Sequence, residues 1–547
     1  MRNILRVDKF LIATFALFGF IFWHLAKEML QVRPDGWYAG HINLWGDLAF
    51  HLSLINKFQE SDKFLPDNPI FAGDKINYPI FADWITAQIA RIVGIDFALF
   101  ITTSLAGILL IAVAIIFVKI FIKKSSVVFL SLMFFFLNGG FGFYYFFRDL
   151  FYSQQNFLIF ITHLPRQYTD LKDQGYWWIN NYLAYLLPQR GFLIAIPVTL
   201  VIFSLLYLGQ TRNKTKFFIL AGFLSGALPL IQAHSLLAVF LVSACFFGFM
   251  LPSSVFRKDF LKNWLSFAVI TILVAFPLFK TISTQGNPLE FIRFEPGWTS
   301  NENIFWFWFK NLGIFGPLLV ISAVWLLIKN RHLFNLYVPF AIIFLLSNLF
   351  VFQPWDFDNS KLLLYWYFAS SIVVAYFLHD QFFSGGFLRR ILGSILVFFL
   401  TLSGLIDIFR TFTPVTNYQM FSKKDLMLAS EIKTLTPKDV VFVTASNHNH
   451  PIPVLTGRST LLGYPGWLWS HGINYYQREA DISQVYSGTE QADNIIKKYK
   501  VSYVTVGPNE TASFNVNANY FEKFPEINLG YDWQIYNVSN LWSDGER

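Results

Sequence analysis

Long apolar stretches alternate with short polar segments over most of the chain. A helix needs roughly 20 mainly apolar residues to cross a bilayer, and by this measure the pattern predicts about eleven membrane-spanning helices. They are expected at residues 9–25, 97–122, 126–146, 191–208, 217–231, 235–251, 264–280, 312–328, 333–352, 362–378 and 391–409. The predicted fold class is therefore mainly α, a polytopic bundle of transmembrane helices.

Two regions depart from this pattern. The first long loop, residues 26–96, is too polar for a simple turn, with an amphipathic stretch at 47–58 and an apolar piece at 80–93 that could lie on the surface or dip into the membrane. From about Pro414 the composition is mixed and polar. The periodicity there predicts helices at 423–435 and 492–500 and buried strands at 440–444 and 501–506. We therefore expect a transmembrane domain at 1–411, including loop 26–96, and a small α/β domain at 412–547.

Basic residues fall on alternate loops between the apolar stretches. The basic loops are residues 1–9, 123–124, 212–216, 257–262, 329–331 and 389–390. Lys and Arg in short loops stay on the cytoplasmic side, so the N-terminus is expected there. Its first apolar stretch has no good cleavage site and is interpreted as an uncleaved span. An odd number of spans then puts the C-terminal domain outside a multi-pass protein of the cytoplasmic membrane.

The composition agrees with a membrane protein and narrows its function. The chain is 54% hydrophobic and 14% charged, whereas soluble domains carry about 25% charged residues. The net charge of +8 comes mostly from the basic loops. We interpret it as a signal for the orientation of the chain in the membrane and as attraction to anionic lipid, and not as nucleic-acid binding. The single Cys245 excludes an internal disulfide. The sequence has no Walker loop, dinucleotide fingerprint or nucleophile elbow, which argues against ATP-driven transport.

The remaining loops, which alternate with the basic ones, contain the residues that could carry chemistry. Asp47 and His51 are four residues apart, so on a helix they share a face. Asp47 could be a general base for a hydroxyl acceptor or a metal ligand, and His51 could orient it, bind the same metal or bind phosphate. The simpler interpretation is an exposed helix start in which Asp47 favours the positive end of the helix dipole.

Cationic residues on other loops of this side suit a phosphate. Arg190 follows Gln189 at the start of a span and could bind phosphate bidentately, while His234 lies on a very short turn between two spans. The loop at 352–361 carries the carboxylates Asp356 and Asp358, the amide Asn359 and the lysine Lys361. Lys361 could hold a lipid-linked phosphate as a point charge. The simpler alternatives are a structural histidine and a solvated turn with a local Asp–Lys pair.

Weaker candidates lie elsewhere. Further candidates for binding substrate or a metal are Gln189, Asp356, Asp358, Asn359 and, on the outer face, Arg166. In the tail, His448 and His450 are two residues apart, which is a poor zinc signature without Cys or an acidic partner. Residues 463–467 (GYPGW) are turn-forming and aromatic, and they suit stacking on a sugar or covering an active cavity.

At these residues the chain resembles the GT-C superfamily of polytopic membrane glycosyltransferases, and more closely certain bacterial and archaeal membrane proteins. The shared patterns are Gly46-Asp47-x-x-x-His51, Pro188-Gln189-Arg190, His234-Ser235, Pro354-Trp355-Asp356-x-Asp358-Asn359-x-Lys361 and Gly463-Tyr464-Pro465-Gly466-Trp467. GT-C enzymes use polyprenyl-phosphate sugars as donors, place an acidic residue in the first outer loop and often carry a soluble C-terminal domain.

The resemblance implies an inverting transfer of a sugar from a polyprenyl-phosphate donor to a glycan, lipid or protein acceptor on the outer face. Asp47 would be the base or, with His51, would help to hold a divalent cation such as Mg²⁺ or Mn²⁺. Arg190, His234 and Lys361 would hold the lipid phosphate. Many GT-C members carry an acidic pair in the first outer loop, whereas here no carboxylate adjoins Asp47.

Two other functions fit parts of the sequence. A transporter or flippase for lipid-linked sugars would need charged groups in the middles of helices or paired broken spans, whereas here the charges cluster at the outer ends. A non-catalytic receptor or assembly protein that binds glycan predicts that Asp47, Arg190 and Lys361 lie far apart.

Overall fold

The computed structural model describes residues 8–250, 257–282, 291–413, 417–529 and 532–543. The chain forms two compact units, each built from segments that are distant in sequence. The first comprises Met1–Lys27, Thr103–Leu278 and Leu289–Thr416; the second comprises Glu28–Thr102, Phe279–Pro288 and Asn417–Arg547. The long first loop and the C-terminal region thus fold together in the second unit.

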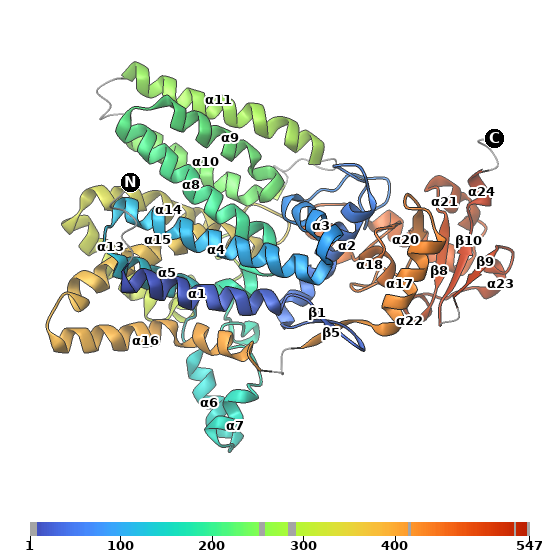
Figure 1. Cartoon of the computed structure of the whole chain (residues 1–547), viewed down its shortest axis with the longest axis horizontal. Coiled ribbons are helices and arrows are strands. Elements are labelled where there is room, and N and C mark those ends of the chain that lie inside the picture. Colours follow the sequence, from blue (N-terminus) through green and yellow to red (C-terminus); the bar gives the residue numbers. More distant parts are fainter. Residues whose placement is uncertain (1–7, 251–256, 283–290, 414–416, 530–531, 544–547) are drawn as a thin grey trace. The chain divides into compact units, whose positions relative to one another are not determined.

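The first unit is a helical bundle (Figure 1), and its described residues also form one short β-ribbon. Its helices are α1 (Lys9–Lys27), α4 (Ile95–Phe121, which begins in the second unit), α5 (Ser125–Phe136), α6 (Phe143–Ser153), α7 (Phe157–Thr162), α8 (Arg190–Arg212), α9 (Thr215–Ile231), α10 (Ala233–Met250), α11 (Arg257–Ile282), α12 (Ile304–Leu312), α13 (Phe315–Lys329), α14 (Arg331–Leu349), α15 (Ser360–Leu378) and α16 (Phe387–Arg410). Strands β3 (Arg293–Phe294) and β4 (Phe350–Val351) pair antiparallel.

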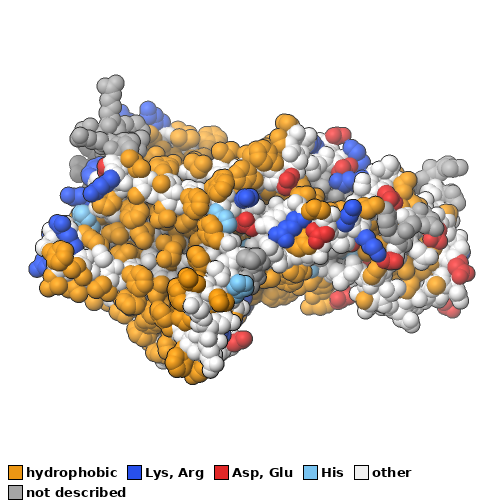
Figure 2. All heavy atoms as spheres, turned by 60° about the horizontal axis from the view of Figure 1, so that its bottom comes forward, with side chains coloured by type: hydrophobic (Ala, Val, Ile, Leu, Met, Phe, Trp, Pro, Cys, Tyr) orange, Lys and Arg blue, Asp and Glu red, His pale blue; other side chains and the backbone are white. Residues whose placement is uncertain are grey.

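The predicted polytopic bundle is confirmed. Among the described residues, eight helices are long and apolar enough to cross a membrane, or nine if α12 and α13, bent by 95° at their junction, form one span. The apolar helices α5 and α9 are shorter. Helix α15 is central, because it packs against α5, α10, α13 and α14. Outward-facing side chains of the bundle are largely apolar (Figure 2), as lipid contact requires; Ile328, Leu273 and Phe276 are examples.

One predicted span is interrupted. Residues 126–146 do not form one helix, because α5 ends at Phe136 and α6 begins only at Phe143. The intervening backbone packs directly on other segments: a Cβ on Gly140 would collide with the carbonyl oxygen of Lys310. The amides of Asn180 and Asn181 donate to the carbonyl oxygens of Phe136 and Phe135, at 3.0 and 2.7 Å. These bonds satisfy carbonyls that a continuing helix would have used.

The second unit is mixed α/β. Its first-loop elements are β1 (Gln31–Arg33), β2 (Gly36–Ala39), α2 (Trp45–Glu60) and α3 (Phe81–Val93). Its C-terminal elements are β5 (Tyr418–Ser422), α17 (Lys423–Leu435), β6 (Val441–Val443), α18 (Pro451–Leu455), β7 (Ser459–Thr460), α19 (Pro465–Ser470), α20 (Tyr476–Ser487), α21 (Ala492–Lys498), β8 (Tyr503–Val506), α22 (Pro508–Ser513), α23 (Ala518–Phe521), β9 (Glu526–Asn528), β10 (Gln534–Asn537) and α24 (Asn540–Ser543).

Two sheets organise this unit. The larger has the order β7-β6-β8-β10-β9, in which β6 runs parallel to β7 and β8, and β10 runs antiparallel to β8 and β9. Its core includes Phe442, Ile432 and Ile535, which are fully buried. The smaller sheet, β1-β2-β5, joins the first loop to the tail, because β2 pairs with β5. The predicted α/β character of the tail is therefore confirmed, including α17 over the predicted residues.

Candidate functional site

In the first unit, His234 at the start of α10 is joined to the loop between α14 and α15. Nε2 of His234 lies 2.7 Å from Oε1 of Gln353. The Gln353 amide donates to Oδ1 of Asn359 at 2.9 Å, and Asn359 donates to the carbonyl oxygens of Ser347 and Phe350. Two predicted residues, His234 and Asn359, thus belong to one network, and Gln353 is the link that sequence reasoning missed.

This network also assigns the protons of His234. Both donor bonds of the Asn359 amide go to backbone carbonyls, so its oxygen must face Gln353. The Gln353 oxygen therefore faces the histidine, and Nε2 must carry a proton. Nδ1 of His234 is buried and has no hydrogen-bond partner among the described residues. That atom is a lone-pair acceptor on the neutral ring and a donor on the charged ring.

An ion pair lies beside the network. Lys361, in the first turn of α15, is 2.9 Å from Asp358, and the two side chains are 11% and 10% exposed. Both groups lie within electrostatic range of His234. A pair this well buried has lost most of its hydration, so each charge depends on the other or on a ligand.

Arg190 begins α8 beside the turn that carries His234. The Arg190 side chain is buried. The next residue, Gly191, packs so closely on the carbonyl oxygen of Ile231 that a Cβ there would collide with it. Ile231 ends α9, and the chain reaches His234 three residues later. Segments α8, α9–α10 and α14–α15 therefore bring Gln189, Arg190, His234, Asp358, Asn359 and Lys361 to one region of the bundle.

Two other predicted residues have different surroundings. Arg166 makes a bidentate pair with Asp149, at 2.8 Å from Nε and 2.7 Å from Nη2, and it lines a separate surface hollow of about 550 Å³. Asp356 is half-buried, and its carboxylate accepts the backbone N–H of Phe357 at 2.7 Å. The carbonyl oxygen of Asp356 accepts from the indole of Trp298 at 3.0 Å.

A cavity of about 1010 Å³ runs along the bundle next to this loop. Its walls come from α12, α13 and α14 and are mostly apolar, and Trp366 of α15 also lines it. The polar lining residues include Ser300, Glu302 and Asn348. Trp298, which bonds to Asp356, stacks on the lining residue Trp308 with ring centroids 5.4 Å apart. The wall of the cavity is therefore linked through Trp298 to the loop that carries Asp358 and Lys361.

In the second unit, Asp47 lies in the first turn of α2 and is partly exposed. His51 lies one turn later and is buried. Nδ1 of His51 is 2.9 Å from Oδ2 of Asp83, which is in the first turn of α3 and fully buried. The carboxylate of Asp83 orients the imidazole and selects its tautomer. Sequence reasoning missed Asp83, although an acidic residue within the apolar piece 80–93 was a signal.

Two side chains of the tail contact the backbone of the residue that precedes Asp47. The carbonyl oxygen of Gly46 lies 2.8 Å from Nε2 of His448 and accepts from the indole N–H of Trp467 at 2.9 Å. The ring of Trp45 stacks on His448, with centroids 4.3 Å apart. The predicted 463–467 segment therefore contacts the start of α2 directly.

The second tail histidine has a structural partner. Nε2 of His450 lies 2.8 Å from Oε1 of Glu510, and both side chains are fully buried. Burial alone would raise the pKa of Glu510, but the interaction with His450 and the backbone N–H of Ala445 outweigh it and hold this pKa below its ordinary value. His448 and His450 therefore serve different partners.

The predicted metal candidates do not make a complete site. Across the residues that the structure describes, no group of three or more His, Cys, Asp or Glu side chains could hold a metal ion. Asp47, His51 and Asp83 thus do not fit a three-ligand centre. A bound Mg²⁺ or Mn²⁺ stays a prediction.

No family model and no curated protein matches this sequence. Solved structures are similar. The apo oligosaccharyltransferase of Archaeoglobus fulgidus matches 91% of this chain and 69% of its own, at 11% identity and a TM-score of 0.55. The form tethered to an acceptor peptide with the NVT sequon matches the same shares at 11% identity and 0.51. Apo ArnT from Cupriavidus metallidurans matches 97% of this chain and 98% of its own, at 10% identity and 0.48.

At such low identity the likeness to the oligosaccharyltransferase shows the fold and leaves the activity open. The matched share, 91% of this chain, includes parts of both units. The chain is a multi-pass membrane protein by its apolar helices. It shares its fold with the oligosaccharyltransferase of Archaeoglobus fulgidus, and the resemblance to the GT-C superfamily is confirmed for the fold alone.

Proposed function

We propose that the protein is an inverting glycosyltransferase of the cytoplasmic membrane. It would move a sugar from a polyprenyl-phosphate carrier to a glycan, lipid or protein acceptor on the outer face. The GT-C fold supports this class of reaction. The observation that carries the proposal is the buried network of His234, Gln353 and Asn359 beside the Lys361–Asp358 pair.

A donor phosphate would supply a hydrogen-bond partner and a negative charge to this network. A buried polar atom without a partner, such as Nδ1 of His234, calls for a ligand. A phosphate oxygen would bond to it, either by lending a proton to the neutral ring or by accepting one from the charged ring. Lys361 would supply a point charge and Arg190 a bidentate contact. These cations would stabilise the negative charge that develops on the leaving phosphate.

The long cavity suits the carrier's hydrocarbon tail. It is lined mostly by apolar side chains of membrane-spanning helices, and Trp308 and Trp298 link its wall to the loop of Lys361. A lipid in this cavity would keep its chain at membrane depth and its phosphate beside that loop. The volume of about 1010 Å³ lies near the upper end of ligand pockets, which hold roughly 300–1,000 Å³.

Asp47 is the proposed general base. It would take the proton from the acceptor hydroxyl as that oxygen attacks the anomeric carbon from the face opposite the phosphate. Positioned proton transfer of this kind is worth roughly 10²–10⁴-fold in rate. The pair of Asp83 and His51 would hold α2 and α3 together beneath this carboxylate. No step is assigned to a metal.

The test supplies the purified full chain in lipid nanodiscs with labelled polyprenyl-phosphate sugars and a membrane extract as acceptor. Label transfer by wild type and a loss of at least roughly 100-fold in Asp47→Asn would support the proposal. Asp62→Asn is the matched control, because Asp62 is exposed just after α2.

Equal transfer by Asp47→Asn and wild type would refute the catalytic assignment. If wild type transfers no label but moves labelled lipid between the two leaflets of a liposome membrane, the protein is a flippase. If it does neither and retains glycan from the extract, it is a binding or assembly protein.

A further inference from the structure

A second pocket lies at the other end of α15 from Lys361. It holds about 260 Å³ and is lined by Phe121, Ile122, Lys123, Lys124, Asn330, Leu333, Tyr376, His379, Asp380 and Ser384. Helix α15 has 19 residues, so this pocket is about 28 Å from the proposed phosphate network. Its lining residues come from the ends of α4, α14 and α15, which the basic loops place on the predicted cytoplasmic side.

The polar part of this pocket is cationic. Lys123 and Lys124 both line it. The carboxylate of Asp380 is 3.9 Å from Lys329, which partly offsets its charge. His379 is fixed in place, because its Nδ1 lies 2.9 Å from the hydroxyl of Ser126. The pocket therefore presents a net positive charge and polar groups, which suit an anionic headgroup.

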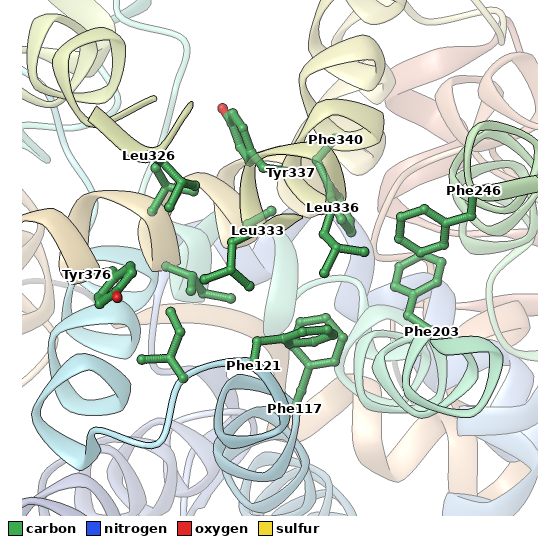
Figure 3. A pocket seen from close by; sticks show the side chains of 14 residues that line it. Phe117, Phe121, Phe203, Phe246, Leu326, Leu333, Leu336, Tyr337, Phe340 and Tyr376 are labelled. Carbon is green, nitrogen blue, oxygen red and sulfur yellow. The ribbon is translucent and has the colours of Figure 1, made fainter. Parts of the chain in front are cut away.

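An apolar cavity continues from this pocket into the bundle. It holds about 70 Å³, and Phe121, Ile122, Leu333 and Tyr376 line both spaces. Figure 3 shows its side chains: in this view Phe117 and Phe121 of α4 lie below Leu333 and Leu336 of α14, and Phe203 and Phe246 lie at the right, across from Leu326 and Tyr376. The combination of a cationic mouth and an aromatic, apolar interior is that of a site for an amphiphile.

We propose that this cavity binds a phosphate-bearing anionic lipid of the cytoplasmic leaflet. Its phosphate would lie between Lys123, Lys124 and His379, and the start of one hydrocarbon chain would enter between α4 and α14. A free phosphate ion would use only the polar half. Because the site is at the far end of α15, the proposal does not depend on glycosyl transfer.

The test measures lipid binding to the purified full chain in detergent by native mass spectrometry. Wild type should retain phosphatidylglycerol in preference to phosphatidylcholine. Lys123→Ala/Lys124→Ala should lower the phosphatidylglycerol affinity about 10- to 30-fold. The control Lys214→Ala/Lys216→Ala removes two exposed lysines from another basic loop, and it should change the affinity less than about twofold.

The variant Ala369→Leu separates the lipid from free phosphate, because Ala369 lines only the apolar cavity. It should weaken phosphatidylglycerol binding and leave competition by inorganic phosphate unchanged, and it also tests the site if the lysine variant does not fold. Equal retention of both lipids would overturn the proposal. So would an equal loss in the two lysine variants, or an Ala369→Leu protein that binds phosphatidylglycerol as wild type does.

Discussion

Nε2 of His448 lies 2.8 Å from the carbonyl oxygen of Gly46, although 402 residues separate the two. The indole of Trp467 bonds to the same oxygen. Two tail side chains therefore fix the backbone immediately before Asp47. In an enzyme this arrangement would set the position of the carboxylate from outside its own helix.

We predict that Trp467→Phe lowers kcat and leaves the KM for the donor nearly unchanged. The substitution keeps the aromatic ring and removes one hydrogen bond, so the stability loss should be about 1 kcal/mol. Kinetics with labelled donor and a thermal unfolding scan check this. Trp469→Phe is the control, because Trp469 lies on the same helix and is 44% exposed. An unchanged kcat in Trp467→Phe would show that the hydrogen bond from Trp467 to Gly46 does not position Asp47.

We predict that Lys361→Gln destabilises the bundle by about 3–5 kcal/mol, because it leaves Asp358 buried without its cation. The double variant Lys361→Gln/Asp358→Asn should recover most of that stability and still bind the donor poorly. Thermal unfolding and donor titration separate the two effects. A double variant that binds the donor with wild-type affinity would show that Lys361 is not part of the phosphate site.

We predict that Asp83→Ala costs about 1–3 kcal/mol, since it leaves the buried His51 without its carboxylate. Asp83→Asn should cost less, because its amide oxygen can still accept from Nδ1. Unfolding midpoints in detergent, compared with the exposed Asp62→Asn, provide the measurement. Equal losses in the Ala and Asn variants would mean that the hydrogen bond contributes little.

We predict that the second unit loses stability below about pH 4.5 through Glu510. The pKa of this carboxyl is lowered in the folded protein: burial opposes ionisation, but His450 and the backbone N–H of Ala445 outweigh it. A lowered pKa adds stability above the unfolded value, and this is lost as the pH falls through the folded one. Unfolding midpoints measured between pH 3 and 7 should show the loss. The variant Glu510→Gln should make the midpoint less dependent on pH, whereas the control Glu490→Gln, at an exposed position, should leave that dependence unchanged.

Much of the fold follows from local patterns. Apolar segments of about 20 residues predict spanning helices because a bilayer accepts little else, and the turn between α9 and α10 was visible in the polar residues near Gln232. The helix at Lys423–Leu435 was predicted from periodicity, and in the structure Ser422 and Asp425 form its capping box. These signals are contained within single segments.

The sequence by itself determined a membrane bundle, an α/β tail and the polar residues Asp47, Arg190, His234 and Lys361 as candidates. Only the tertiary structure decided the break after α5, the pairing of His51 with Asp83 and the bond of His234 to Gln353. The physical reason is that hydrophobicity and periodicity are properties of neighbouring residues. A hydrogen-bond partner is set by which distant segments pack together, and no local pattern encodes that choice.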